Sequence, residues 1–143
     1  MSSVSKDGKA LVWDVTSGKQ LADLKWQAPE ESRYLFKRCR FAAIEERPGA
    51  SRLFLMTNPV GKAGKLKAFL QLWDPQDWTL KKVASCDESL AALAVRDDGR
   101  FVAAGTMFSG SVIVYVAFSL QVSSLRSARF IFLIYRGFRK SIM

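Results

Sequence analysis

The chain has no histidine, only two cysteines and no apolar run as long as the 18 residues or so of a transmembrane helix. Without histidine, it has no Ser-His or Cys-His catalysis of its own. Cys39 and Cys86 are too few and too far apart for a metal-ligand pattern; one disulfide between them is possible, but we expect both to be reduced and buried. The polar residues 1–8 do not resemble a secretory signal. The sequence therefore predicts no catalytic site, no metal, no cofactor and no membrane-spanning helix within these residues.

Acidic residues are also scarce, and the net charge of +9 is unevenly placed. Residues 122–143 carry five basic residues and no acid, whereas residues 1–121 carry 17 basic and 13 acidic residues. A basic surface favours acidic partners or anionic lipid, but it also serves solubility alone. We expect a solvated surface over most of the chain.

What the chain does have is short apolar runs separated by glycine-containing turns. Residues 89–121 show the pattern most clearly: apolar segments at 90–95, 101–105 and 112–118 are separated by Asp98-Gly99 and Ser109-Gly110. Runs of this length, rich in β-branched and aromatic residues and bounded by such turns, predict an antiparallel three-stranded meander. Further strands are expected at 10–15, 20–24, 33–44, 52–57, 66–73 and 79–85, with Asn58 and Pro59 ending the strand at 52–57.

An aromatic residue at the end of a strand recurs along the chain. Trp13-Asp14, Trp73-Asp74 and Tyr115-Val116 each follow a turn and precede another, at spacings of 60 and 42 residues. The second spacing is close to the roughly 40–45 residues of a four-stranded WD-repeat blade, and loops lengthen the first. We expect each aromatic side chain to pack between neighbouring sheets and each following aspartate to bond the turn backbone. The sequence therefore predicts an all-β WD-repeat β-propeller.

The predicted domain spans residues 1–121, with blades around 2–24, 33–86 and 89–121, or about two and a half blades. Residues 122–143 break the pattern and are predicted to be a divergent basic and apolar tail. Asp7, Asp14, Asp74, Asp97 and Asp98 are expected to act as turn residues, not as catalytic carboxylates. The structural repeat positions are Asp7, Gly8, Trp13, Asp14, Trp73, Asp74, Asp98, Gly99, Gly110 and Tyr115.

Residues 109–121 (SGSVIVYVAFSLQ) resemble the prolactin regulatory element-binding family, the animal counterparts of the membrane-bound exchange factor for the Sar-type small GTPase. Further matching pieces are Ser5-Lys6-Asp7-Gly8 with Val12-Trp13, Cys39-Arg40-Phe41, Arg52-Leu53-Phe54, Leu72-Trp73-Asp74 and Ser85-Cys86. The resemblance covers roughly residues 2–121.

The resemblance implies a propeller of about seven blades on the cytosolic face of the endoplasmic reticulum membrane, held there by a C-terminal anchor. It also implies that the protein promotes GDP release from the GTPase. This exchange starts COPII vesicle formation for transport to the Golgi. Against the family pattern, the N-terminal blades, the final blades and the anchor are missing, and no family exchange residue can be carried over. We therefore expect a part of an exchange factor, without bond-making chemistry and without exchange activity on its own.

Two alternative functions remain open from the sequence. If the chain belongs to a generic WD-repeat scaffold for protein interactions, we expect it to have no effect on nucleotide release from the GTPase. A DNA-binding transcriptional regulator, which the family name suggests, predicts a basic patch, with Trp78 nearby, formed by Lys62, Lys65, Lys67, Lys81 and Lys82. The contrary interpretation of this patch is a solvated loop and an edge strand whose lysines discourage pairing, and we favour it.

Overall fold

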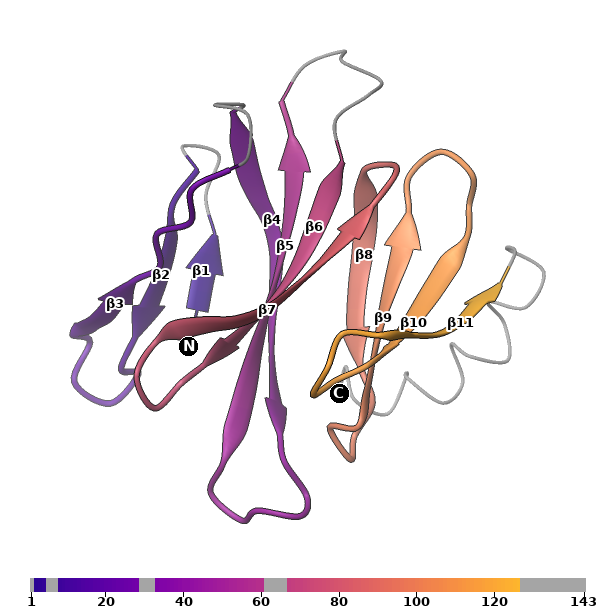
Figure 1. Ribbon diagram of the computed structural model, residues 1–143. Coiled ribbons are helices and arrows are strands. Elements are labelled where there is room, and N and C mark those ends of the chain that lie inside the picture. The colour runs from indigo at the N-terminus through magenta and orange to yellow at the C-terminus, as the bar shows by residue number, and fades with distance from the viewer. Residues whose placement is uncertain (1, 5–7, 29–32, 61–66, 127–143) are drawn as a thin grey trace.

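The computed structural model describes residues 2–4, 8–28, 33–60 and 67–126 (Figure 1). Within these ranges the chain forms eleven β-strands and no helix, so the predicted all-β class is confirmed. The strands form three antiparallel sheets that fan out side by side, and within each sheet the strands adjacent in sequence are paired.

The first sheet contains β1 (Ser2–Val4), β2 (Ala10–Trp13) and β3 (Gln20–Asp23). The second contains β4 (Tyr34–Ala43), β5 (Ser51–Pro59), β6 (Ala68–Asp74) and β7 (Thr79–Cys86). The third contains β8 (Leu90–Val95), β9 (Phe101–Thr106), β10 (Val112–Val116) and β11 (Val122–Arg126).

The third sheet extends beyond the boundary expected from the sequence. Residues 122–126 were assigned to the tail, but β11 pairs with β10 in the register Val112↔Arg126 to Tyr115↔Val122. Residues 122–126 show no apolar alternation, so the sequence does not mark them as a strand. The rest of the predicted tail, residues 127–143, lies outside the described residues.

The middle strands of the second sheet, β5 and β6, are buried on both faces because this sheet lies between the other two. Leu53 and Leu55 of β5 pack with Val12 of the first sheet, whereas Phe54 and Met56 belong to the core shared with the third sheet. All four of these β5 side chains are at most 1% exposed. An uninterrupted apolar run such as Leu53–Met56 is typical of a strand covered on both sides.

The same backbone irregularity recurs in all three sheets. The pairing of the last two strands shifts register between Val12 and Trp13, between Leu72 and Trp73, and between Val114 and Tyr115. A β-bulge there bends the strand and re-aims the side chain that follows it. Trp73 packs with the first sheet, and Tyr115, which is 1% exposed, packs in the core between the second and third sheets.

The turn after each bulge also repeats. In each turn an N–H donates to the carbonyl four residues earlier: Gly18 to Asp14, Trp78 to Asp74 and Leu120 to Val116. All three have positive φ, at 68°, 55° and 53°. Bulky residues rarely adopt this conformation. Leu120 and Trp78 do so with side chains packed in the two inter-sheet cores, which offsets the cost.

Candidate functional site

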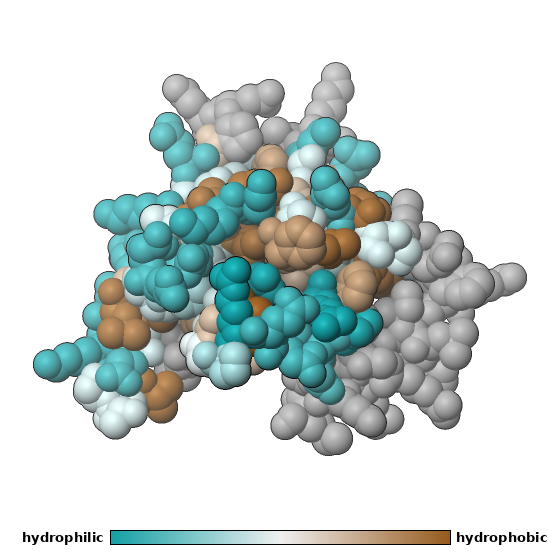
Figure 2. Space-filling model, turned by 60° about the horizontal axis from the view of Figure 1, so that its bottom comes forward, coloured by the Kyte–Doolittle hydropathy of each residue, from teal (hydrophilic) through white to brown (hydrophobic). Residues whose placement is uncertain are grey.

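Four connections gather at one end of the three sheets and form what we call the loop face. They are the β4–β5 loop, the β6–β7 turn, the β8–β9 turn and the β10–β11 turn, which all lie in the lower half of Figure 1. Figure 2 shows this face, where hydrophilic side chains surround a smaller hydrophobic area. Loops held on a rigid scaffold are where binding residues of such folds concentrate.

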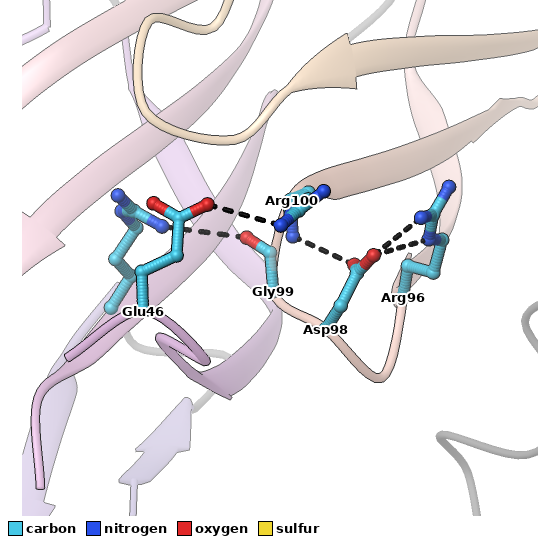
Figure 3. Close-up of polar contacts among 6 residues, drawn as sticks. Glu46, Arg96, Asp98, Gly99 and Arg100 are labelled. Carbon is cyan, nitrogen blue, oxygen red and sulfur yellow. Dashed lines mark hydrogen bonds and ion pairs between the residues drawn. The ribbon is translucent and has the colours of Figure 1, made fainter. Parts of the chain in front are cut away.

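The β8–β9 turn is pressed directly against the end of β4. Gly99 has φ +71°, and a Cβ placed on it would lie 2.1 Å from the carbonyl oxygen of Ala43. Arg52 of β5 reaches across the same junction and donates from Nη1 to the Gly99 carbonyl at 3.4 Å (Figure 3). The turn that carries Asp98 is therefore fixed to the second sheet by backbone contact and by a guanidinium group.

Two ion pairs complete this junction (Figure 3). Arg100 bonds Glu46 of the β4–β5 loop at 3.2 Å, and Asp98 accepts hydrogen bonds from the Arg96 guanidinium and from the Arg100 N–H. Burial raises the pKa of the Asp98 carboxyl, but these hydrogen bonds and the two arginine charges outweigh it and leave the pKa below its ordinary value. The Arg96 guanidinium also lies 4.9 Å from the centre of the Phe101 ring.

Two further arginines, Arg47 and Arg52, lie beside the junction. Among the described residues, Arg47 and Arg52 form no ion pair. Partial burial lowers the pKa of the Arg52 guanidinium, and the positive charge of Arg47 lowers it further, although Glu46 acts against both. These two guanidinium groups therefore make an electropositive point on the loop face.

The repeat positions predicted from the sequence lie at the two ends of the sheets. Asp14 Oδ1 accepts the Thr16 N–H at 3.0 Å, and Asp74 Oδ1 accepts the Gln76 N–H at 2.9 Å, both on the loop-face side. The hydrogen bonds from the Ser17 hydroxyl and the Thr16 N–H hold the pKa of Asp14 below its ordinary value. Trp13 is half-buried at the end of β2.

Gly8 and Gly110 lie in the connections at the opposite end, with φ +81° and +66°. Asp7 lies outside the described residues. The structure thus brings Asp98, Gly99, Asp74 and Asp14 to one end of the sheets, whereas Gly8 and Gly110 are separated from them.

Glu88 holds the β9–β10 connection at the end opposite the loop face. Its Oε1 accepts the N–H groups of both Phe108 and Ser109 at 2.9 Å, and these two bonds hold the pKa of the Glu88 carboxyl below its ordinary 4.5. A lowered pKa in the folded state means that the stabilisation is present above pH 4.5 and is lost as the pH falls through the folded-state pKa.

We expect Glu88→Gln to remove this pH dependence. In the wild type, protection of the Phe108 and Ser109 amides against hydrogen exchange falls below pH 4.5, after correction for the intrinsic rate. In Glu88→Gln the protection is lower at neutral pH and stays constant with pH. An unchanged pH profile in the variant would show that Glu88 does not hold this turn.

Asn58 was missed by the sequence reasoning, which assigned Asn58 and Pro59 as the end of a strand. Both residues instead lie within β5, and Asn58 is 3% exposed. Its side chain donates to the Leu90 carbonyl at 2.7 Å and accepts the Leu90 N–H at 2.9 Å. It therefore pairs with the backbone of β8 as another strand would, and it joins the second sheet to the third.

Of the described lysines of the predicted basic patch, Lys67 lies apart from Lys81 and Lys82, at the other end of β6 and β7. Lys67 precedes β6 near Cys86 and pairs with Asp87 at 3.7 Å, whereas Lys81 pairs with Asp77 at 3.4 Å. Five strand residues, about 17 Å, separate Lys81 from Cys86 along β7. Trp78 packs in the core between the first two sheets, and Lys62 and Lys65 lie outside the described residues.

Cys39 and Cys86 are both free thiols, and only Cys86 is buried. Within the part of the chain that the structure describes, no three metal-ligating side chains come together. A search of the same residues finds no helix of sufficient length and apolarity to cross a membrane.

Comparison with known proteins agrees with the resemblance seen in the motifs. The chain is 34% identical to guanine nucleotide-exchange factor SEC12 of Rattus norvegicus and 33% identical to that of Mus musculus, in both cases over 125 residues. The matched residues make up 83% of this chain but only 29% of each relative, so the chain spans less than a third of their length. The predicted resemblance to these exchange factors is confirmed.

In structure, the chain is similar to the Dos1 propeller, with a TM-score of 0.64 and 16% identity over 87% of this chain and 33% of that one. At this identity the similarity shows the fold, and it confirms the propeller architecture. No family model matches the chain.

Proposed function

We propose that this chain supplies consecutive blades of a guanine nucleotide-exchange factor for a Sar-type small GTPase, and thereby acts in COPII vesicle formation for transport from the endoplasmic reticulum to the Golgi. The observation that carries the proposal is the 33–34% identity to SEC12 exchange factors over 83% of the chain. The similarity to a propeller fold supports the proposal, because each of the three sheets then corresponds to one blade of a propeller.

The mechanism that fits these residues is non-covalent. An exchange factor accelerates GDP release by binding the nucleotide-free GTPase more tightly than the GDP-bound form, and this difference in affinity shifts the equilibrium. It needs a rigid surface, with no acid, base or nucleophile to make or break a bond. The loop face, whose turns are fixed by the Gly99 contact and by the Glu46–Arg100 ion pair, is rigid in this sense.

Location and further partners follow from the same proposal. The cytosolic face of the endoplasmic reticulum membrane and contact with COPII components are what the family resemblance implies for the whole exchange factor. The two alternatives have less support: Lys67 lies apart from the other described lysines of the predicted nucleic-acid patch, and a generic scaffold does not account for the identity to SEC12.

The proposal is tested by transplanting the chain into a relative. The aligned residues of rat SEC12 are replaced by those of this chain, and release of a fluorescent GDP analogue from a Sar-type GTPase is measured. We expect the chimera to retain an exchange rate within about tenfold of SEC12, a loss of no more than about 1.4 kcal/mol in transition-state stabilisation. The chain alone is expected to leave the release rate unchanged.

The matched control replaces the same SEC12 residues with the corresponding part of the Dos1 propeller, which shares the fold at 16% identity to this chain. We expect that chimera to be inactive although folded, as judged by circular dichroism and size-exclusion chromatography. A folded chimera of this chain that is no more active than the Dos1 chimera would contradict the proposed function.

A further inference from the structure

A cleft of about 420 Å³ opens on the loop face between the β4–β5 loop and the β6–β7 turn. A second depression of about 320 Å³ lies over the β8–β9 turn. Ile44, Arg52 and Phe118 line both, so the two form one continuous surface across the second and third sheets. Arg47, Leu72 and Pro75 also line the larger cleft.

The charges in the larger cleft are unbalanced at one end. Arg47 and Arg52 line it and form no ion pair among the described residues. Glu45 lines the smaller depression without an ion pair among the described residues, and the other acids nearby are already bound. Glu46 pairs with Arg100, Asp98 with Arg96, and Asp77 with Lys81, while Asp74 accepts the Gln76 N–H within its own turn.

The loop that presents Arg47 has a fixed backbone. The Ile44 N–H donates to the Ala50 carbonyl at 3.0 Å, the Arg47 N–H to Ile44 at 3.0 Å, and the Ala50 N–H to Arg47 at 2.9 Å. The Arg52 backbone lies in β5 opposite Ala42 of β4. Both guanidinium groups therefore extend from ordered backbone, which reduces the entropy lost when a ligand binds.

An exposed aromatic ring stands beside these two arginines. Phe118 of the β10–β11 turn is 65% exposed, although Ala117 and Leu120 on either side of its turn are at most 5% exposed. Leu72 and Pro75 line the adjoining wall of the cleft. Aromatic and arginine side chains next to each other on a rigid surface are the residue types that dominate binding energy at protein interfaces.

We propose that this cleft binds a linear acidic peptide of a partner protein, with a carboxylate on Arg47 and Arg52 and a large apolar side chain against Phe118. Guanidinium groups bind carboxylates through paired hydrogen bonds, so the charge complementarity identifies an acidic ligand. Asp74 also lines the cleft and disfavours a second carboxylate next to it. This inference does not depend on the exchange-factor proposal.

The test is fluorescence anisotropy of the full chain with a fluorescein-labelled octapeptide that has two aspartates followed by a phenylalanine at its centre. We expect saturable binding that weakens as the salt concentration rises, because the arginines are partly exposed. Replacing the peptide's aspartates with asparagine, or its phenylalanine with alanine, is expected to weaken binding at least tenfold.

Arg47→Gln combined with Arg52→Gln should likewise weaken binding at least tenfold, and Phe118→Ser should weaken it by a similar factor. The matched control, Lys37→Gln with Arg38→Gln, removes two positive charges from exposed positions of β4 that do not line the cleft. It is expected to change the affinity by less than about twofold. Circular dichroism confirms that each variant is folded, and Arg47→Lys with Arg52→Lys, which keeps the charge, is expected to give an intermediate affinity.

Three results would overturn the proposal. An equal loss in the control variant would show non-specific attraction to a basic protein, and equal affinity for the asparagine peptide would show that no carboxylate is recognised. Tighter binding of a phosphoserine peptide that lacks both aspartates and phenylalanine would identify a phosphate site instead.

Discussion

Replacing Gly99 with alanine is expected to lower the free energy of unfolding by about 3 kcal/mol or more. The residue has φ +71°, which costs a residue with a Cβ about 1–2 kcal/mol. The added Cβ would also lie 2.1 Å from the Ala43 carbonyl oxygen, and because that neighbour is backbone, the second and third sheets must separate locally. Urea unfolding of the full chain, followed by circular dichroism, measures the change.

Gly18→Ala is the matched control for this prediction. Gly18 has nearly the same φ, +68°, but nothing lies within 4 Å of a Cβ placed on it. Its substitution should cost only the conformational strain, about 1 kcal/mol. Equal losses in the two variants would show that the contact between Gly99 and Ala43 does not hold the two sheets together.

Asn58→Leu is expected to destabilise the chain by about 2–5 kcal/mol, because it leaves the Leu90 N–H and carbonyl buried without partners. The Met107 N–H donates to the neighbouring Ser89 carbonyl, so the Leu90 backbone groups point away from β9 and toward Asn58. The side chain therefore takes the place of a missing strand. Urea unfolding again measures the effect.

Thr57→Val serves as the control at the adjacent buried position. It keeps the shape and removes one hydrogen bond, from the Thr57 hydroxyl to the Phe69 carbonyl at 3.2 Å within the same sheet, so about 1 kcal/mol is expected. If this variant lost as much stability as Asn58→Leu, the bridge to Leu90 would have no special role.

Asn58→Asp tests the hydrogen bonds alone, because it keeps the volume of the side chain but replaces the donating amide with a carboxyl group. Burial and the facing Leu90 carbonyl raise the pKa of the new carboxyl in the folded state above its ordinary value near 4. A raised folded-state pKa means that stability is fully present below that ordinary value and is lost as the pH rises through the folded-state pKa. The variant should therefore be more stable in mild acid than at neutral pH.

The fold class followed from the sequence because local signals agreed with it. Short apolar runs, glycine turns and the recurring Trp13-Asp14 and Trp73-Asp74 pairs predicted an all-β propeller, which the structure confirms. The turn chemistry of Asp14 and Asp74 is local and therefore visible in sequence. Predicted strand ends differ from the observed ones by a few residues, as with 112–118 against β10 at Val112–Val116.

The contacts between sheets could not be predicted, because they join residues far apart in the chain. Asn58 next to Pro59 is typical of a loop, and only the position of Leu90 in space makes it a bridge between strands. Likewise, Gly99 resembles an ordinary hairpin glycine until the Ala43 carbonyl is placed against it. The sequence gives no sign that Arg47, Arg52 and Phe118 lie together, because their proximity depends on the packing of the second sheet on the third.

The packing of the sheets as consecutive blades of one body underlies both the exchange-factor proposal and the peptide cleft. Native-state hydrogen exchange of the full chain, with increasing urea, tests it most directly. Amides of β5 in the second sheet and β9 in the third should open in one unfolding step with the same free energy, and the Leu90 amide should open with them. A separate step in which β8, β9 and β10 lose protection while β5 and β6 keep theirs would contradict the shared packing.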